Sequence, residues 1–174
     1  MATATMALLG RTTAALTFAT AHCHARRKDP AIVPHPSRRA RWAAAIVAAA
    51  PPAALVTRAA CQPGARWQPP PSPTVRTLLT AHVLSSAVIE EVVWRGVLTR
   101  RHHPRNLAIA SALGFVAAHL PRDGGRSAPA HAVNAVAWTL SASIGRRLRW
   151  SVLAHTGYNL AAHTLVAETV PPHV

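Results

Sequence analysis

Long apolar runs alternate with clusters of arginine along this chain, and no other feature of the sequence constrains its fold so strongly. Six apolar segments can be drawn, at residues 3–21, 42–55, 78–98, 107–120, 130–144 and 151–167. Several are shorter than the roughly 20 residues that span a bilayer, but basic residues at their ends can snorkel to the interface and extend them. We therefore expect an all-α fold, a polytopic membrane helix bundle with about five or six transmembrane helices.

The charge of the chain is one-sided. Its 174 residues include 19 Lys and Arg but only 5 Asp and Glu, which gives a formal net charge of +14. Such an excess is typical of proteins that bind nucleic acid and of membrane proteins whose cytoplasmic loops collect basic residues. Here the arginines form short clusters between apolar runs instead of spreading over one helix face or sheet. This distribution favours a lipid bilayer as the partner and argues against nucleic acid.

The loops between the apolar segments alternate in basic content. Residues 23–41, 99–105 and 145–149 are rich in Arg, and the loops at 61–76 and 121–129 are weaker. Because short cytoplasmic loops of membrane proteins carry the excess of basic residues, the three rich loops are expected in the cytoplasm. The chain is accordingly predicted to be an integral, multi-pass membrane protein.

The N-terminal part of the chain has a less regular pattern than the rest. Its second apolar segment contains Pro51-Pro52, and the loop that follows contains three consecutive prolines and cannot be helical throughout. We expect an N-terminal membrane-associated region with basic and Pro-rich loops over residues 1–74, a helix bundle over 75–167 and a short tail over 168–174.

Two of the five acidic residues, Glu90 and Glu91, are adjacent inside an apolar run. A carboxylate in a membrane segment costs about 2.5–3.5 kcal/mol, so this pair calls for a reason. Glu91 and Arg95 are four residues apart on one helix face, in the order that favours an ion pair. Glu90 points about 100° away around the helix. We therefore assign Glu91 and Arg95 to structural support and Glu90 to chemistry.

Two histidine motifs share the same four-residue spacing. Phe115 precedes His119 near the end of one apolar segment, and His155 precedes Asn159 in the last one. Each pair therefore lies on one face of its helix. In the hairpin formed by the segments at 78–98 and 107–120, Glu90 and His119 both lie roughly 20 Å from the turn, so they can face each other.

The three motifs together resemble the CPBP family of intramembrane endopeptidases, which includes the type II CAAX prenyl endopeptidases. That family carries E-E-x-x-x-R, F-x-x-x-H and H-x-x-x-N or D on successive membrane helices, and the same motifs occur here in the same order between residues 75 and 167. The resemblance implies a catalytic core of four helices within the bundle and a location in a membrane, the inner membrane in a bacterial cell.

The resemblance also implies a mechanism. Glu90 and His119 would hold and activate a water molecule, and His155 and Asn159 would stabilise the oxyanion formed at the scissile carbonyl. No covalent nucleophile and no cofactor are then needed, although a zinc ion bound by Glu90, His119 and His155 is an alternative. Phe115 joins the residues that support the site.

These inferences lead to one preferred function and one alternative. The preferred function is an endopeptidase that cuts a peptide or protein substrate near the cytoplasmic face, and the sequence leaves open whether that substrate is prenylated. The alternative is a non-catalytic membrane scaffold or bacteriocin-immunity-type protein that keeps the motif residues for packing. We interpret His131 and Asn134 as a packing or cavity-lining pair, and we assign no role to His82, His102, His103 and His163.

Overall fold

The computed structural model of the chain describes residues 36–62, 64–68, 70, 72–99 and 105–166, together with a few isolated positions before residue 25. Apart from those isolated positions, the first apolar segment, at residues 3–21, lies outside the described residues, and so does the tail at 168–174. So do His102 and His103, which belong to the turn between the first two motif helices.

The described residues form five α-helices, which confirms the all-α prediction. These are α2 (Arg38–Ala60), α3 (Pro73–Arg95), α4 (Arg105–Asp123), α5 (Ala128–Gly145) and α6 (Arg149–Thr164). Two short 3₁₀ turns, η1 (Gly96–Thr99) and η2 (Gly125–Ser127), extend α3 and precede α5. The strands are two residues long, β1 (Arg66–Trp67) and β2 (Leu165–Val166), and they pair antiparallel.

Local sequence explains where α2 and α3 begin. The hydroxyl of Ser37 accepts a hydrogen bond from the Ala40 amide at 3.1 Å, and that of Ser72 accepts one from the Val75 amide at 3.2 Å. Serine is a favoured N-cap because its oxygen satisfies an amide at the helix start. Pro73 at the first position of α3 suits the same place, where the amide hydrogen that proline lacks has no helical partner.

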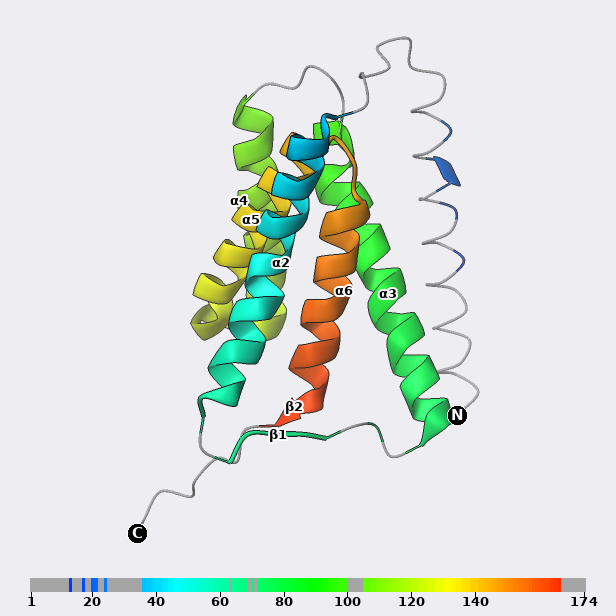
Figure 1. Cartoon of the computed structure of the whole chain (residues 1–174), viewed down its shortest axis with the longest axis vertical. Coiled ribbons are helices and arrows are strands. Elements are labelled where there is room, and N and C mark those ends of the chain that lie inside the picture. Colours follow the sequence, from blue (N-terminus) through cyan, green and yellow to red (C-terminus); the bar gives the residue numbers. More distant parts are fainter. Residues whose placement is uncertain are drawn as a thin grey trace.

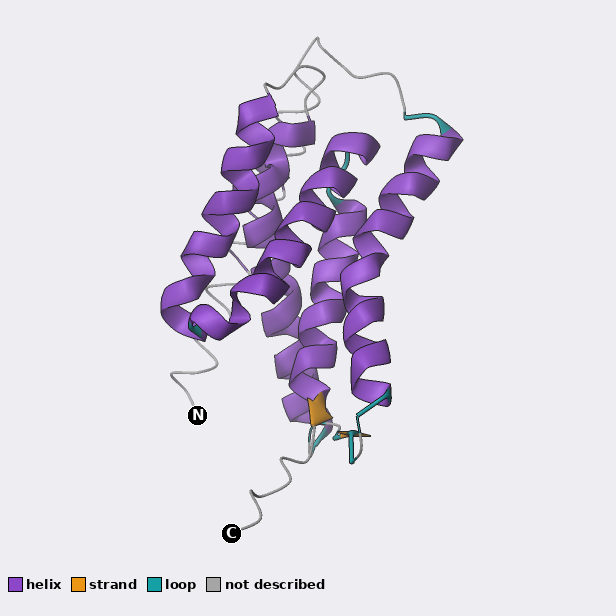
Figure 2. Cartoon of the chain, turned by 90° about the vertical axis from the view of Figure 1, so that its left-hand side faces the viewer, coloured by secondary structure: helices purple, strands orange, loops and turns teal. Residues whose placement is uncertain are grey.

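The helices run alternately up and down the bundle (Figure 1). The starts of α2, α4 and α6 and the ends of α3 and α5 therefore lie at one end, which we call the basic end. It contains the described parts of the three arginine-rich loops, so the structure places them on the same side. The β1–β2 ladder lies at the opposite end (Figure 2).

Helix α2 belongs to the same bundle as the motif helices. It continues through Pro51 and Pro52 without interruption, and it packs mainly against α5 and α6. The hydroxyl of Ser141 on α5 donates to the carbonyl oxygen of Ala44 at 2.9 Å. One turn further along α5, a β-carbon added to Gly145 would lie 2.8 Å from that of Ala44, so glycine allows this close approach. The N-terminal region expected over residues 1–74 thus supplies a helix of the core.

Polar side chains gather inside the bundle and large apolar ones cover its outside. The buried polar or charged residues come from α3 to α6 and from η1, and they are Ser85, Glu91, Arg95, Thr99, Ser111, His119, Asn134, Thr139, Ser141, Ser151 and His155. In contrast, Ile46, Leu113 and Leu153 are each about 60% exposed or more (68%, 65% and 59%). This distribution is expected when hydrocarbon surrounds a bundle whose helices contact each other through small and polar residues.

Two helices are long and apolar enough to cross a membrane by themselves. They are Arg38–Ala60 and the continuous segment Pro73–Thr99. The other three helices in the described part of the chain have between 16 and 19 residues, which is short for a bilayer about 30 Å thick.

Candidate active site

Glu90 lies beside two histidine rings that come from different helices. Its Oε2 atom is 3.3 Å from Nε2 of His119 on α4 and 3.7 Å from Nε2 of His155 on α6. The Glu90 side chain is 24% exposed, and those of His119 and His155 are 9% and 3% exposed. The structure therefore brings the three predicted residues together, although they are up to 65 positions apart in the sequence.

Glu91 and Arg95 form the ion pair that their spacing predicts. Arg95 Nη1 lies 2.6 Å from Glu91 Oε1, and both side chains are fully buried. The guanidinium also lies over the rings of Phe115 and Trp138, at 4.6 Å and 5.6 Å from their centroids. Its Nε donates to the Thr139 hydroxyl at 3.4 Å. These contacts fix the end of α3 that carries Glu90.

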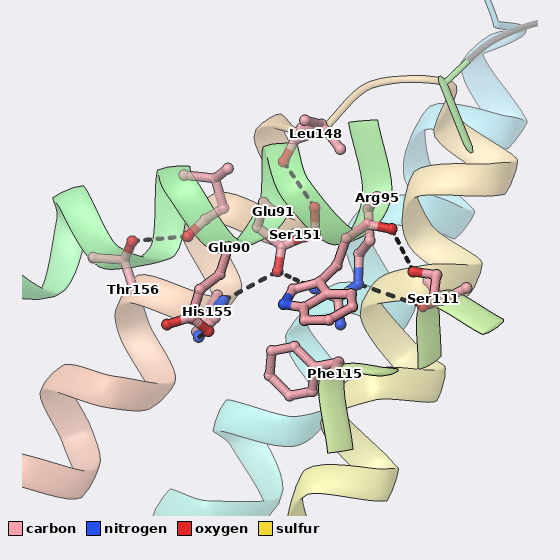
Figure 3. Close-up of polar contacts among 12 residues, drawn as sticks. Glu90, Glu91, Arg95, Ser111, Phe115, Leu148, Ser151, His155 and Thr156 are labelled. Carbon is pink, nitrogen blue, oxygen red and sulfur yellow. Dashed lines mark hydrogen bonds and ion pairs between the residues drawn. The ribbon is translucent and has the colours of Figure 1, made fainter. Parts of the chain in front are cut away.

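The sequence did not reveal that Glu91 has a second partner. His155 Nδ1 lies 3.0 Å from the same Oε1 atom that accepts from Arg95. The His155 ring is also stacked on the indole of Trp138, with a centroid distance of 4.2 Å and an interplanar angle of 22°. Figure 3 shows Glu90, Glu91 and His155 grouped beside Arg95. Glu91 thus orients a ring of the site as well as balancing a buried cation.

A backbone carbonyl orients the other histidine. His119 Nδ1 lies 2.8 Å from the carbonyl oxygen of Phe115, four residues earlier on α4. The two rings are 4.3 Å apart, so Phe115 also covers one face of the imidazole. A carbonyl oxygen can only accept a hydrogen bond, so Nδ1 of His119 must be the donor and must carry the hydrogen.

The same reasoning applies to His155, whose Nδ1 faces a carboxylate that is paired with Arg95. Each imidazole therefore carries its hydrogen on Nδ1, and in the neutral ring the Nε2 lone pair is directed toward Glu90. Two basic nitrogens and one carboxylate oxygen converge at one place. A water molecule placed there can be held through both of its hydrogens.

These residues line a cavity of about 340 Å³ that contains more titratable groups than the sequence motifs predict. Asn159, one turn after His155, lies on its wall. His131 Nε2 is 2.9 Å from Oδ2 of Asp123, and the His131 ring lies 4.7 Å from that of His119. The interpretation of His131 and Asn134 as a cavity-lining pair agrees with this geometry. The remaining lining residues, several of them unassigned in the sequence, are His82, Val83, Ser86, Phe115, Trp138, Tyr158 and His163.

A family model described as type II CAAX prenyl endopeptidase Rce1-like matches residues 72–161, which is more than half of the chain. The chain belongs to the Rce1-like family. Comparisons with curated proteins and with solved structures give no match.

Membership in the Rce1-like family agrees with the resemblance seen in the sequence. The matched region begins at the N-cap of α3 and ends within α6, so it contains every candidate site residue from Glu90 to Asn159. The family is one of membrane endopeptidases. Helix α2 lies outside the matched region but contributes Ala48 to the core cluster that also contains Phe115 and Trp138.

Among the residues that the structure describes, no set of three or more His, Cys, Asp or Glu side chains is arranged to hold a metal ion. Zinc binding by Glu90, His119 and His155 stays a prediction that chelation can test.

The cavity extends away from the basic end. Asp123 is the last residue of α4, His131 is in the first turn of α5 and His163 is in the last turn of α6. All three line the cavity, and Asp123 and His163 are among its exposed residues. The wall of the cavity thus reaches the end of the bundle that carries the β1–β2 ladder, whereas cleavage near the cytoplasmic face would require access from the basic end.

Proposed function

We propose that this protein is an intramembrane endopeptidase that hydrolyses a peptide bond of a peptide or protein substrate with water activated by Glu90. One observation carries the proposal. A single carboxylate oxygen of Glu90 lies within 3.3 Å and 3.7 Å of two imidazole nitrogens inside a cavity. The family of the chain, whose members are membrane endopeptidases, supports the same reaction.

The first step is attack by water. Glu90 takes one proton of a water molecule that Nε2 of His119 holds through the other, and the water oxygen forms a bond to the carbonyl carbon of the substrate. The π electrons of the carbonyl move to its oxygen and give a tetrahedral oxyanion. When this intermediate collapses, the C–N bond breaks and Glu90 returns its proton to the leaving amine. The new carboxylic acid passes its remaining proton to the amine, so the products are a carboxylate and an ammonium group, and the enzyme is regenerated.

The two residues of α6 have different parts in this proposal. The Asn159 amide group donates hydrogen bonds in any protonation state, so it is suited to stabilise the oxyanion. His155 donates through Nε2 only when its ring is an imidazolium, because Nδ1 already carries the hydrogen shared with Glu91. The Glu91 carboxylate would stabilise that cation. His155 thus contributes most when the oxyanion and the imidazolium are present together.

The setting of the reaction is part of the same proposal. The protein would be a multi-pass protein of the bacterial inner membrane, with the basic end in the cytoplasm. The reaction uses only groups of the chain, and no cofactor is invoked. The apolar outer faces of α4, α5 and α6, with Leu113, Val133 and Leu153 exposed, support insertion of these shorter helices as well.

A cleavage assay on the purified protein tests the proposal. The substrates are a library of quenched fluorogenic peptides, offered with and without a prenylated cysteine near the C-terminus. Glu90→Gln should abolish cleavage while the protein stays folded, because the amide cannot accept the proton of water. Asp123→Asn is the matched comparison, since it removes a different carboxylate from the same cavity.

Two results would contradict the proposal. If Asp123→Asn loses activity and Glu90→Gln retains it, then Asp123 and not Glu90 is the catalytic carboxylate. Binding of peptides by the wild-type protein without any cleavage would support the alternative, a non-catalytic scaffold of the same family.

A further inference from the structure

Another pocket lies at the basic end of the bundle. It is lined by Arg38, Arg41 and Trp42 of α2 and by Arg149 and Trp150 of α6, and it has a volume of about 260 Å³. All five residues belong to the first two turns of their helices. We call this feature the Arg/Trp pocket. It shares no lining residue with the cavity that contains Glu90.

The positive charge of the Arg/Trp pocket is not balanced by the protein. Within the described part of the chain, none of the three arginines forms an ion pair with a carboxylate, and neither α2 nor α6 has an acidic residue in its first turn. The N-terminus of a helix carries a partial positive charge, so arginines there are electrostatically unfavourable by themselves. An anion bound between Arg38, Arg41 and Arg149 would interact favourably with three guanidinium groups and with two helix ends.

The tryptophans make the pocket amphipathic. The Arg149 guanidinium lies 4.8 Å from the centroid of the Trp150 ring, in a cation–π contact. A guanidinium stacked in this way keeps the N–H groups at its edge available for the paired oxygens of a phosphate. Trp42 is 59% exposed and provides a second apolar wall. An inorganic anion would use only the arginines, whereas an amphiphile would use the indoles as well.

The position of the pocket in the membrane indicates which amphiphilic molecule could occupy it. Arg38 is the first residue of α2, and α2 is one of the two helices that can cross a membrane by themselves. The end of such a helix lies at the level of the lipid headgroups, where tryptophan and arginine are common. We propose that the Arg/Trp pocket binds the phosphate of an anionic glycerophospholipid headgroup and that the bound lipid joins the first turns of α2 and α6. This proposal depends on membrane insertion and not on the proposed peptidase reaction.

The experiment compares two double variants that remove the same charge from the same end of the bundle. Arg38→Gln/Arg149→Gln removes two pocket residues. Arg39→Gln/Arg105→Gln is the matched control, because both residues are exposed, lie at the starts of α2 and α4, and do not line the pocket. Binding of phosphatidylglycerol and of phosphatidylcholine to the delipidated protein is measured in detergent by native mass spectrometry and by the shift in unfolding temperature.

The wild type and the control should retain phosphatidylglycerol in preference to phosphatidylcholine. The pocket variant should bind it about 25-fold more weakly, which corresponds to about 5-fold for each of the two arginines removed. Its unfolding temperature without lipid should equal that of the wild type, because the substituted side chains are exposed.

Equal weakening in both variants would mean that the anionic lipid responds only to the general charge of this end, and this would overturn the proposal. Full competition by millimolar inorganic phosphate would also overturn it, since the pocket would then be a simple anion site. Cleavage activity is not part of the measurement, so failure of this proposal and failure of the peptidase proposal are distinguishable.

Discussion

Replacing Glu91 by Gln should destabilise the protein far more than the same replacement of its neighbour Glu90. Glu91 and Arg95 are fully buried and 2.6 Å apart, so the substitution leaves a buried guanidinium without its counter-ion. Removing one partner of a buried ion pair costs about 3–5 kcal/mol. For a protein of this size each kcal/mol lowers the unfolding temperature by about 2–4 °C, which predicts a decrease of about 6–20 °C. The Glu90 side chain is partly exposed and is not part of that pair.

A double variant separates the two roles of Glu91. In Glu91→Gln/Arg95→Met the buried cation is gone as well, and replacement of a buried ion pair by apolar groups is often neutral for stability. The unfolding temperature should therefore recover most of its loss. Turnover should not recover, because His155 Nδ1 still lacks the carboxylate that lies 3.0 Å away in the wild type.

Thermal unfolding in detergent, followed by intrinsic fluorescence, gives the stability values, and the peptide assay gives the turnover. The reasoning is refuted if Glu91→Gln unfolds at the wild-type temperature, or if Glu90→Gln loses as much stability as Glu91→Gln. Full activity in the double variant would show that Glu91 does not orient His155.

Three further predictions concern the oxyanion, the α3–α4 contact and the orientation in the membrane. Asn159→Ala should lower turnover by about 100- to 1000-fold with little effect on peptide binding. The activity of the wild type should survive exhaustive chelation. Loss of that activity to a chelator, with recovery on added zinc, would instead show that the site holds a metal. Gly114→Ala should lower stability by about 1–3 kcal/mol in a denaturation assay, because the new β-carbon would lie 2.5 Å from Cζ3 of Trp94. In a Cys23→Ser background, the exposed thiol of Cys61 at the end of α2 should react with a membrane-impermeant maleimide in intact cells. If Cys61 is labelled only in inverted vesicles, the orientation of the protein is the reverse of the one proposed.

The parts of the site that depend on one helix could be predicted from the sequence. A spacing of four residues specifies the ion pair of Glu91 with Arg95 and the shared face of Phe115 and His119, because helix geometry alone brings such side chains together. The approach of Glu90 to His119 also followed from simple geometry, since the two lie at similar distances from a hairpin turn. In these cases the constraint is local and its period is known.

Contacts between helices that are distant in the sequence could not be predicted in the same way. Glu91 and His155 are 64 positions apart, and their contact depends on the rotation and tilt of α6 against α3. The ring of Trp138 stacks on His155 from α5, whose sequence contains no family motif. The pairing of His131 with Asp123 depends on how the turn at η2 joins α4 to α5. A sequence period specifies which face a residue occupies but not which helix lies opposite.

Helix α2 shows the same limit in the fold. The sequence predicted an apolar segment over 42–55, interrupted at Pro51-Pro52, in a region apart from the bundle. The structure has a continuous helix from Arg38 to Ala60, because packing against α5 and α6 compensates for the weaker internal hydrogen bonding near the prolines. Only the small residues at positions such as Ala44 and Gly145 hint at that packing, and they are common in every apolar segment of this chain.

The stacking of His155 on Trp138 gives the protein an optical reporter of its own chemistry. The indole is fully buried and its ring centroid lies 4.2 Å from that of the imidazole. A charged imidazolium in contact with an indole quenches its emission much more strongly than a neutral imidazole does. In a variant that keeps Trp138 as its only tryptophan, emission intensity would therefore follow the proton on His155 without a label and without detection of a cleavage product. Stopped-flow mixing could then time the appearance of that charge during a single turnover.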